Sequence, residues 1–212
     1  MPSLTNQRLM TGPATASQSS LTPRLSVRGG QGLSGTLKVS GAKNSALVLM
    51  TASLLTGDVV ELSNVPDLTD IAGMGDILRC LGVSVDRQND RVRLQADQLS
   101  SAKPPYELVN SLRASFFSIG PLLGRLGQAE VPLPGGCRIG ARPVVEHIRG
   151  LKALGAHVSV EHGIVRAAVP GSQQRLKGAS IVFDCPSVGA TETVLMAAVL
   201  AEGTTTLENA AQ

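Results

Sequence analysis

The spacing of apolar residues along this chain switches repeatedly between the helical period and the strand period. In the first hundred residues, two stretches have apolar residues every three or four positions, as in amphipathic helices: Lys43–Leu55 and Thr69–Leu81, with Thr69 as the expected N-cap. Alternating or short apolar runs predict the strands of the same region: Leu25–Arg28, Thr36–Ser40, Val59–Leu62, Val83–Val85 and Val92–Leu94. The last two strands flank a polar turn and predict a hairpin.

The same order of elements returns after Lys103-Pro104-Pro105. The pattern predicts helices at Tyr106–Leu126 and Val144–Leu154 and strands at Ala129–Leu133, Val158–Val160 and Ile164–Ala168. A third copy begins at Ile181 and continues through a helix ending at Ala201 and a strand at Thr204–Leu207. This copy lacks the second helix and the hairpin of the other two.

Glycines mark the repeat. Gly57, Gly127 and Gly203 each stand between a helix and a strand, and Leu81-Gly82 and Leu154-Gly155 each close a helix. Landmarks that recur about every 70 residues indicate an internal structural repeat. The sequence therefore predicts an α/β fold of repeated helix, strand, helix and hairpin units, at about 42–100, 106–170 and 180–212, with the third unit incomplete.

Composition narrows the class of protein. The chain has 212 residues, of which 42% are hydrophobic, only 2% aromatic and 17% charged, so it predicts an aliphatic core and argues against disorder. The net charge of +3 is too small to indicate a nucleic-acid binder. Seven Lys or Arg but only three Glu lie between Lys103 and Lys152, and this local excess favours an acidic small molecule as partner.

Cysteine usage and the termini bear on localisation. The three cysteines are odd in number and widely spaced, so they predict neither a disulfide framework nor a metal site, and a reducing cytoplasm fits them. We expect Cys80 and Cys185 to be packing residues. No apolar run reaches the length of a membrane span. Residues 1–24 hold eight Ser or Thr and no acid, which is typical of a disordered polar tail or of a transit peptide.

The loop Leu133–Pro143 carries the strongest candidate chemistry. Its glycines permit a sharp turn that places Cys137 between Arg138 and Arg142. Nearby guanidinium groups favour a thiolate and match phosphate oxygens. A glycine-proline turn around a small packed cysteine is the alternative interpretation.

Each unit also has polar residues near the beginning of its first long helix. These are Lys43-Asn44, Arg113 with Ser115, and Ser187–Thr191. Helix N-termini present free N–H groups and the positive end of the dipole, so N-termini that converge would bind phosphate. Ordinary helix capping is the alternative.

Five motifs together carry a resemblance to a known family: Ser40-Gly41-Ala42-Lys43-Asn44, Leu112–Ser115, Leu133–Pro143, Ser187–Glu192 and Ala201–Thr205. They closely resemble the UDP-N-acetylglucosamine enolpyruvyl transferases, and the likeness runs from about Leu25 to the last residue. The resemblance implies a two-lobed fold, with three units per lobe about a pseudo-threefold axis and substrates bound between the lobes. Residues 25–212 would supply most of one lobe. The second lobe is absent, and the opening strands would pack against it.

The resemblance also implies a reaction. The family transfers the enolpyruvyl group of phosphoenolpyruvate to the 3'-hydroxyl of UDP-N-acetylglucosamine, the first committed step of peptidoglycan synthesis. It works in the cytoplasm, in cell wall biogenesis, and needs no cofactor or metal. Cys137 matches the proton donor, which is also the target of fosfomycin. Residues matching phosphoenolpyruvate contacts are Lys43, Asn44 and Arg142. Residues matching UDP-N-acetylglucosamine contacts are Arg113, Arg142, Pro143, Val144, Val145, Glu146, His147, Ser187, Val188 and Gly189.

Departures from the family pattern leave alternatives open. Val145 stands where many members have an acid, and Cys185 where some have a lysine. The aspartate that accepts the hydroxyl proton belongs to the absent lobe, so we expect this chain alone to be inactive or nearly so. A non-catalytic UDP-sugar-binding remnant and one subunit of a split enzyme, with the second lobe on another chain, remain alternatives. Asn44 and Cys137 speak against a third, the shikimate-pathway enolpyruvyl transferase.

Overall fold

The computed structural model describes residues 25–30, 32–134, 144–171 and 175–212. By its internal contacts the chain divides into two units, Met1–Lys38 and Val39–Gln212. The described residues before Val39 form neither helix nor strand, and their large apolar side chains, such as Leu33 at 98%, are almost fully exposed. The strands predicted at Leu25–Arg28 and Thr36–Ser40 are therefore wrong for this chain. An extended segment becomes a strand only when its backbone groups pair with a neighbouring strand.

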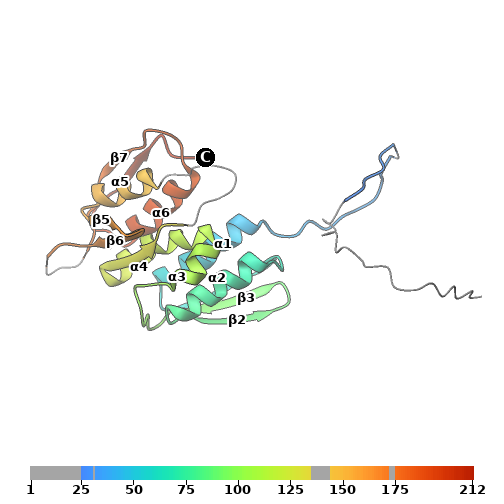
Figure 1. Cartoon of the computed structure of the whole chain (residues 1–212), viewed down its shortest axis with the longest axis horizontal. Helices are drawn as coiled ribbons and strands as arrows, with labels where there is room; N and C mark the ends of the chain where they lie inside the picture. Colours follow the sequence, from blue (N-terminus) through green and yellow to red (C-terminus); the bar gives the residue numbers. More distant parts are fainter. Residues whose placement is uncertain (1–24, 31, 135–143, 172–174) are drawn as a thin grey trace, which may run out of the picture. The chain divides into compact units, whose positions relative to one another are not determined.

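The unit Val39–Gln212 repeats one order of elements (Figure 1). The first repeat contains α1 (Lys43–Ala52) with its 3-10 extension η1 (Ser53–Leu55), β1 (Val59–Leu62), α2 (Thr69–Cys80), β2 (Ser84–Gln88) and β3 (Arg91–Gln95). The second contains α3 (Tyr106–Ser111), η2 (Arg113–Ser118), α4 (Ile119–Leu126), β4 (Gln128–Pro132), α5 (Val145–Ala153), β5 (His157–Glu161) and β6 (Ile164–Ala168). The third contains β7 (Ser180–Val182), α6 (Val188–Ala198) and β8 (Thr206–Glu208). The predicted order of helices and strands is confirmed.

The first two repeats each build a three-stranded sheet, and the two sheets have the same topology. In each, the first strand pairs antiparallel with the last strand of the hairpin, giving the orders β1-β3-β2 and β4-β6-β5. The registers place Glu61 opposite Arg93 and Glu130 opposite Arg166, and each pair is joined by an ion pair of 3.6 Å. The repeat therefore extends to individual cross-strand contacts. Among the described residues, the third repeat contributes the parallel pair β7-β8.

The predicted helix ends at Gly82 and Gly155 share one capping geometry. Both glycines have positive φ, 99° and 91°. In each case the N–H of the next residue reaches back five positions, from Val83 to the carbonyl of Leu78 and from Ala156 to that of Leu151. This is the Schellman motif, which glycine favours because it adopts left-handed φ without steric cost.

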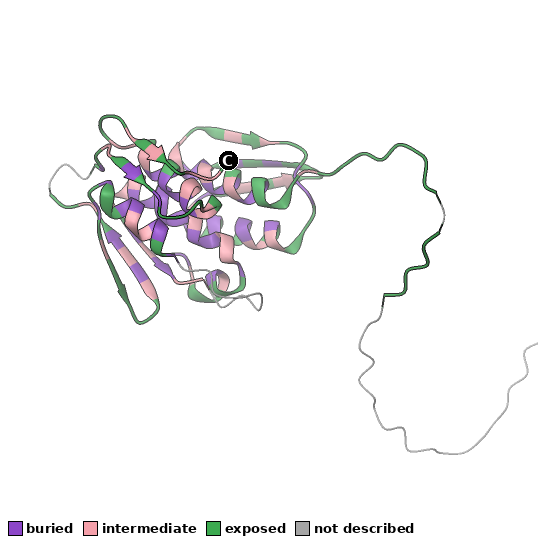
Figure 2. Ribbon diagram, turned by 90° about the horizontal axis from the view of Figure 1, so that it is seen from above, coloured by how far each residue is buried: buried purple, intermediate pink, exposed green. Residues whose placement is uncertain are grey.

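Helices fill the interior of this unit and the sheets lie outside them (Figures 1 and 2). The core is aliphatic, as predicted from the scarcity of aromatic residues. Helices α4 and α6 approach so closely that a Cβ at Gly120 would lie 2.4 Å from the carbonyl oxygen of Thr193. The position of α6, and of its N-terminus, is therefore fixed by backbone contact with α4.

Three local predictions are wrong. The single helix predicted over Tyr106–Leu126 is interrupted at Leu112, which is extended, and the Ser115 hydroxyl donates to the Leu112 carbonyl at 2.5 Å just after this break. Leu68, not Thr69, is the N-cap of α2, and no side chain caps that helix. Cys80 and Cys185 are exposed rather than packed.

Within the described ranges, no helix is long and apolar enough to cross a membrane.

Candidate substrate-binding site

Most of the predicted site residues lie at the beginning of a helix. Lys43 and Asn44 begin α1, Arg113 begins η2, and Ser187–Gly189 surround the start of α6. The stretch from Val144 to His147 begins α5. The break at Leu112 matters here, because it moves Arg113 from the middle of a predicted helix to the first residue of a new helical segment. Cys137, Arg142 and Pro143 lie outside the described residues.

His147 is the centre of a cluster that joins three of these helix ends. Its ring is 7% exposed and its Nδ1 lies 2.9 Å from Thr193 Oγ1 on α6. The ring meets Phe116 of η2 edge to face, with centroids 5.2 Å apart. At Gly189 a Cβ would lie 3.2 Å from His147 Cε1, so the first turn of α6 approaches the imidazole closely. The structure thus brings the predicted residues Arg113, His147 and Gly189 to one place, since Arg113 acts electrostatically on His147.

The electrostatics of this cluster set the charge of His147. Burial, and to a smaller extent the nearby Arg113 charge, lower the pKa of His147 to about 4. The imidazole is therefore neutral at pH 7, with one ring nitrogen as donor and the other as acceptor. The positive charge of the cluster is carried by Arg113. A cation beside a neutral polar ring and a helix N-terminus forms a chemically suitable site for a phosphate group.

The start of α6 is built to present backbone donors. Ser187 is the N-cap, and its hydroxyl accepts the N–H of Ala190 at 3.3 Å. In any α-helix the first N–H groups, here those of Val188 and Gly189, have no acceptor within the helix. The Val188 side chain is 62% exposed. This end of α6 can therefore offer two N–H groups and its dipole to an anion.

The remaining predicted residues have other surroundings. Lys43 Nζ pairs with Asp70 Oδ2 at 2.5 Å, so an anionic substrate would have to compete with a carboxylate from the start of α2. Glu146 is only 8% exposed, and its carboxylate accepts the Asp184 N–H at 3.1 Å. Asn44 and Val145 are exposed, whereas Val144 is buried.

Sequence reasoning missed several residues that shape the cluster. Thr193 lies one helical turn after Gly189, so its i+4 spacing could have placed it on the same face of α6. Phe116 carries no such signal, because it comes from another element and meets the cluster only through tertiary packing. Asp70, which pairs with Lys43 outside the cluster, carries none either. Arg149 and Asp184 likewise gave no sequence signal.

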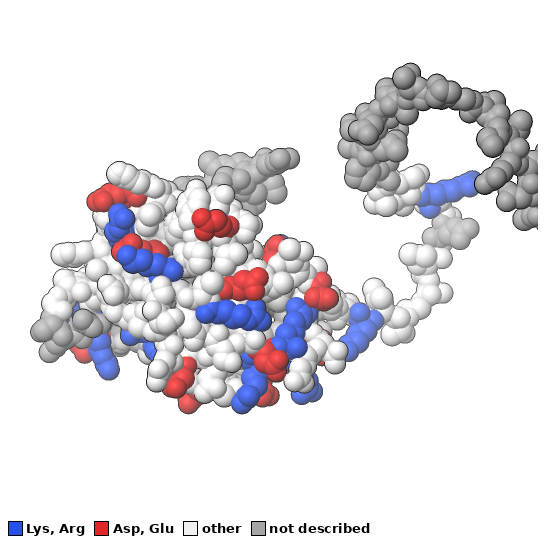
Figure 3. Space-filling view, turned by 60° about the horizontal axis from the view of Figure 1, so that its bottom comes forward, with Lys and Arg blue, Asp and Glu red and all other residues white. Residues whose placement is uncertain are grey.

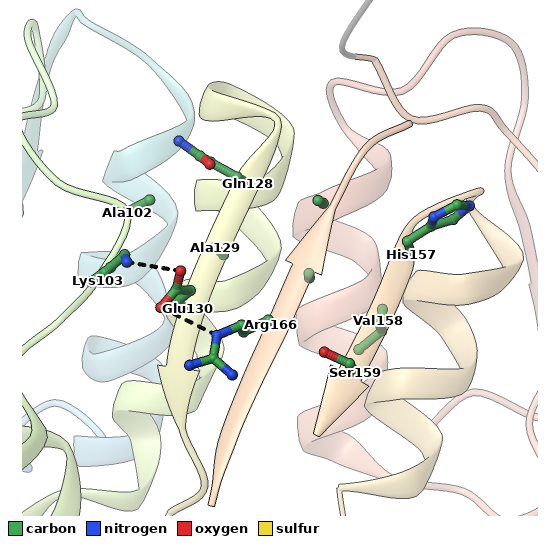
Figure 4. Close-up of a pocket in the computed structure, with 11 residues that line it drawn as sticks. Ala102, Lys103, Gln128, Ala129, Glu130, His157, Val158, Ser159 and Arg166 are labelled. Carbon is green, nitrogen blue, oxygen red and sulfur yellow. Dashed lines mark ion pairs between the residues drawn. The ribbon is translucent and has the colours of Figure 1, made fainter. Parts of the chain in front are cut away.

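A hollow of the surface lies elsewhere, on the outer face of the β4-β6-β5 sheet (Figure 4). Lys103, Glu130 and Arg166 line it, together with His157 and Ser159, and none of the predicted site residues that the structure describes does. Glu130 lies between the two cations, and a hydrogen bond from Lys103, aided by Arg166, lowers its pKa. Arg166 also pairs with Glu161, so the two cations face two carboxylates and the hollow has little cationic character left for an anion.

Acidic and basic side chains are interspersed across the face in Figure 3. Among the described residues, no group of three or more His, Cys, Asp or Glu is arranged to hold a metal ion.

Comparison with known proteins places the chain in a family. The model of the family named EPSP synthase (3-phosphoshikimate 1-carboxyvinyltransferase) matches residues 27–212. The chain belongs to this family of enolpyruvyl transferases. The match spans every helix and strand described above, so the helix-end cluster lies within an enolpyruvyl transferase fold.

Several curated relatives bear the name of an enolpyruvyl transferase different from the one that gives the family its name. The chain is 75% identical over 203 residues to a UDP-N-acetylglucosamine 1-carboxyvinyltransferase of Synechococcus sp. (strain CC9605), covering 96% of this chain and 47% of the relative. It is 57% identical over 188 residues to the enzyme of the same name from Nostoc sp., covering 89% of this chain and 42% of the relative. The predicted resemblance is confirmed, and the chain spans about half the length of these relatives.

Solved enolpyruvyl transferases share the fold. The enolpyruvyl transferase NikO from Streptomyces tendae matches 84% of this chain and 41% of its own, with a TM-score of 0.71 and 24% identity. EPSP synthase from Acinetobacter baumannii matches 82% of this chain and 40% of its own, with a TM-score of 0.60 and 20% identity. The mixed helix and strand architecture is therefore that of an enolpyruvyl transferase.

Proposed function

We propose that this chain is one part of an enzyme that transfers the enolpyruvyl group of phosphoenolpyruvate to the 3'-hydroxyl of UDP-N-acetylglucosamine. The observation that carries the proposal is the meeting of Arg113, His147 and Gly189 from three separate elements. Each is a position matched to the sugar nucleotide by resemblance. The relatives named for this substrate are 55–75% identical to the chain, which favours it over 3-phosphoshikimate.

The N-terminus of α6 is the proposed diphosphate site. Ser187, Val188 and Gly189 would donate their backbone N–H groups to the diphosphate, and the Arg113 guanidinium would neutralise part of its charge. Neutral His147 would donate or accept one hydrogen bond without adding a second charge. Buried Glu146 would act through the protein backbone rather than by touching the substrate. Arg142, Pro143, Val144 and Val145 would complete the sugar nucleotide site.

The proposed chemistry follows addition and elimination. The 3'-hydroxyl oxygen would attack C2 of phosphoenolpyruvate while the Cys137 thiol protonates C3, and phosphate would then leave as a proton is lost from C3. Lys43, Asn44 and Arg142 would hold the phosphate and carboxylate groups. Holding both reactants in register supplies a large part of the rate enhancement in such reactions. The base for the hydroxyl proton would come from outside this chain, and the enzyme would work in the cytoplasm.

We also propose that a further helix and hairpin complete the third unit, giving three units about a pseudo-threefold axis. The support is the internal repeat. β1 and β4 each pair with a hairpin, whereas β8 pairs with β7 alone among the described strands. Leu195 and Val199, one turn apart on α6, are more than half exposed and would be covered by that helix. A second lobe would close over the helix ends.

Phosphate release from phosphoenolpyruvate in the presence of UDP-N-acetylglucosamine tests the function. We expect little or no release by the 212-residue chain alone. We expect release by an extended enzyme, in which the chain is joined to the part of the Synechococcus relative that the match leaves uncovered. Robust turnover by the chain alone would contradict the need for a second lobe. Release with 3-phosphoshikimate instead would contradict the substrate.

Cys137→Ser in the extended enzyme tests the proton donor. We expect a loss of at least about 100-fold in kcat, the usual contribution of a general acid, because a serine hydroxyl is too weak an acid to replace a thiol. Cys80→Ser and Cys185→Ser are matched controls, since both cysteines are exposed and neither is assigned a role. Unchanged kcat in Cys137→Ser would remove the thiol from the mechanism.

A further inference from the structure

The connection between β7 and α6 determines where the proposed diphosphate site lies. It runs from Val182 to the N-cap Ser187. Phe183 anchors it, because the side chain is 1% exposed and the backbone N–H donates to the Glu208 carbonyl at 3.1 Å. The Phe183 carbonyl accepts a hydrogen bond from Asn209 Nδ2 at 2.9 Å. The strand side of the connection is therefore held by β8 and the turn that follows it.

The helix side of the connection is held by two residues of α5. The Glu146 carboxylate accepts the Asp184 N–H through Oε2 at 3.1 Å. Arg149 Nη1 lies 3.4 Å from Glu146 Oε1 and also pairs with the Asp184 carboxylate. Arg149 Nη2 donates to the carbonyl of Val182. One guanidinium thus binds the backbone on one side of Phe183 and a side chain on the other.

The Arg149 guanidinium stabilises both carboxylates of this network. The Glu146 side chain is only 11% exposed, and a carboxylate so enclosed is costly without a cation and hydrogen-bond donors. Asp184 adds a second negative charge nearby, and Arg149 lies between the two acids. A guanidinium presents several donors in a fixed plane, which a lysine ammonium cannot reproduce. The three residues therefore fix one geometry of the connection.

The same helix carries the other half of the site. His147 follows Glu146 on α5 and contacts the first turn of α6 at Gly189. The network and the imidazole thus hold the two ends of one short path, from Asp184 through the Ser187 cap to Gly189. Displacing the connection would move the α6 backbone donors relative to His147.

We infer that Arg149 and Asp184 are positioning residues, which hold Ser187–Gly189 against His147 for the diphosphate of a sugar nucleotide. The inference deepens the proposed function and rests on it for the identity of the ligand. Neither residue needs to touch the substrate. Their effect is transmitted through Glu146 and through the backbone from Val182 to Asp184.

Amide hydrogen exchange of the 212-residue chain tests the holding of the connection. In Arg149→Met we expect exchange of the Asp184 amide to become about tenfold faster or more, as loss of a charged hydrogen-bond partner implies. Arg149→Lys, which keeps the charge but not the planar fork, should give an intermediate rate. Arg79→Met is the matched control, because Arg79 pairs with Asp76 three residues earlier and donates to the Val85 carbonyl, away from α6. Asp184 exchange unchanged in Arg149→Met would overturn the inference.

Steady-state kinetics of the extended enzyme test the consequence for the ligand. We expect Arg149→Met to raise KM for UDP-N-acetylglucosamine about tenfold, with kcat and KM for phosphoenolpyruvate little changed. Partial recovery in Arg149→Lys and no effect in Arg79→Met would support positioning. Faster exchange with an unchanged KM would overturn it. An extended enzyme without turnover on this substrate would overturn the proposed function, while the exchange experiment would still decide whether Arg149 holds the connection.

Discussion

Two charged clusters of this molecule differ in their burial and in the groups that surround their cations. On the outer face of the β4-β6-β5 sheet, the partly exposed cations Lys103 and Arg166 are balanced by the carboxylates of Glu130 and Glu161. At the helix ends, Arg113 lies near a buried neutral imidazole and the first turn of α6. The sheet face forms a hollow, yet of the two regions only the helix ends combine a cation, a buried polar ring and backbone donors.

The internal repeat explains why the sheet cluster is structural. The Glu130–Arg166 pair has a counterpart in the first unit, Glu61–Arg93, at the same register position and the same distance. A contact that recurs in two units belongs to the repeated architecture. The helix ends do not recur in this way, because α1 begins with Lys43 paired to Asp70 whereas α6 begins with a serine cap. The proposed binding site therefore lies where the units differ.

The largest effect is expected from a methyl group added where α4 holds α6, the helix whose first turn forms part of the helix-end region. In Gly120→Ala the new Cβ would lie 2.4 Å from the Thr193 carbonyl oxygen, so α4 and α6 must separate. We expect a loss of about 3 kcal/mol in the free energy of unfolding, measured by urea denaturation. Gly73→Ala is the matched helical control, because its nearest neighbour is a side-chain atom at 4.0 Å, and it should be neutral or stabilising. Equal stability of the two variants would contradict the close packing of α6.

Replacing one arginine in each region should weaken substrate binding at the helix ends and leave it unchanged at the sheet face. In the extended enzyme, Arg113→Met should raise KM for UDP-N-acetylglucosamine between about 10-fold and 100-fold, as expected for a hydrogen bond to a charged group. Arg166→Met should leave KM unchanged, because Arg166 belongs to the sheet cluster. If the two variants raise KM equally, the helix ends have no special role.

The pH dependence of stability should reveal the buried imidazole. Because the folded pKa of His147 is about 4 and lies below the unfolded value, the folded chain binds fewer protons between these values. His147 therefore lowers stability as the pH falls through the unfolded pKa toward 4. Wild type should lose about 2 kcal/mol more than His147→Gln between pH 7 and pH 4.5 in urea denaturation. Parallel pH profiles would contradict a buried neutral histidine.

The smallest effect is expected on the sheet face. Arg166→Met removes a cation from a partly exposed network, so the free energy of unfolding should fall by less than about 1 kcal/mol at pH 7. The lowered pKa of Glu130 means that this contribution is present above the unfolded pKa of the carboxyl and is lost as the pH falls through the folded value. A loss of several kcal/mol would show that the sheet cluster is more than a solvated set of pairs.

The sequence predicted the repeat well because local signals specify it. Apolar period, the glycines after Leu81 and Leu154, and the hairpin turns act within a few residues of where they stand. The predictions from sequence failed where a side-chain hydrogen bond or pairing with another strand accompanies the local structure. The break at Leu112 comes with a hydrogen bond from the Ser115 hydroxyl to the Leu112 carbonyl. The opening strands would need backbone pairing with another strand, which the described residues do not supply.

The site was predicted in part for the same reason. Resemblance named Arg113, His147 and Gly189, and the structure brings these three together. The buried network of Glu146, Arg149 and Asp184 was not foreseen, since it joins residues nearly forty positions apart. Such pairs have no signature in local spacing. The roles of Cys137 and Arg142 stay predictions, because both lie outside the described residues.

The most direct test of the central claim is amide exchange of this chain with and without UDP-N-acetylglucosamine. The account predicts ligand-dependent protection at the starts of η2, α5 and α6, including Arg113, His147 and Gly189, and none on β4, β5 and β6. Protection confined to the sheet face, or equal protection of both regions, would contradict the claim that the helix ends bind the sugar nucleotide.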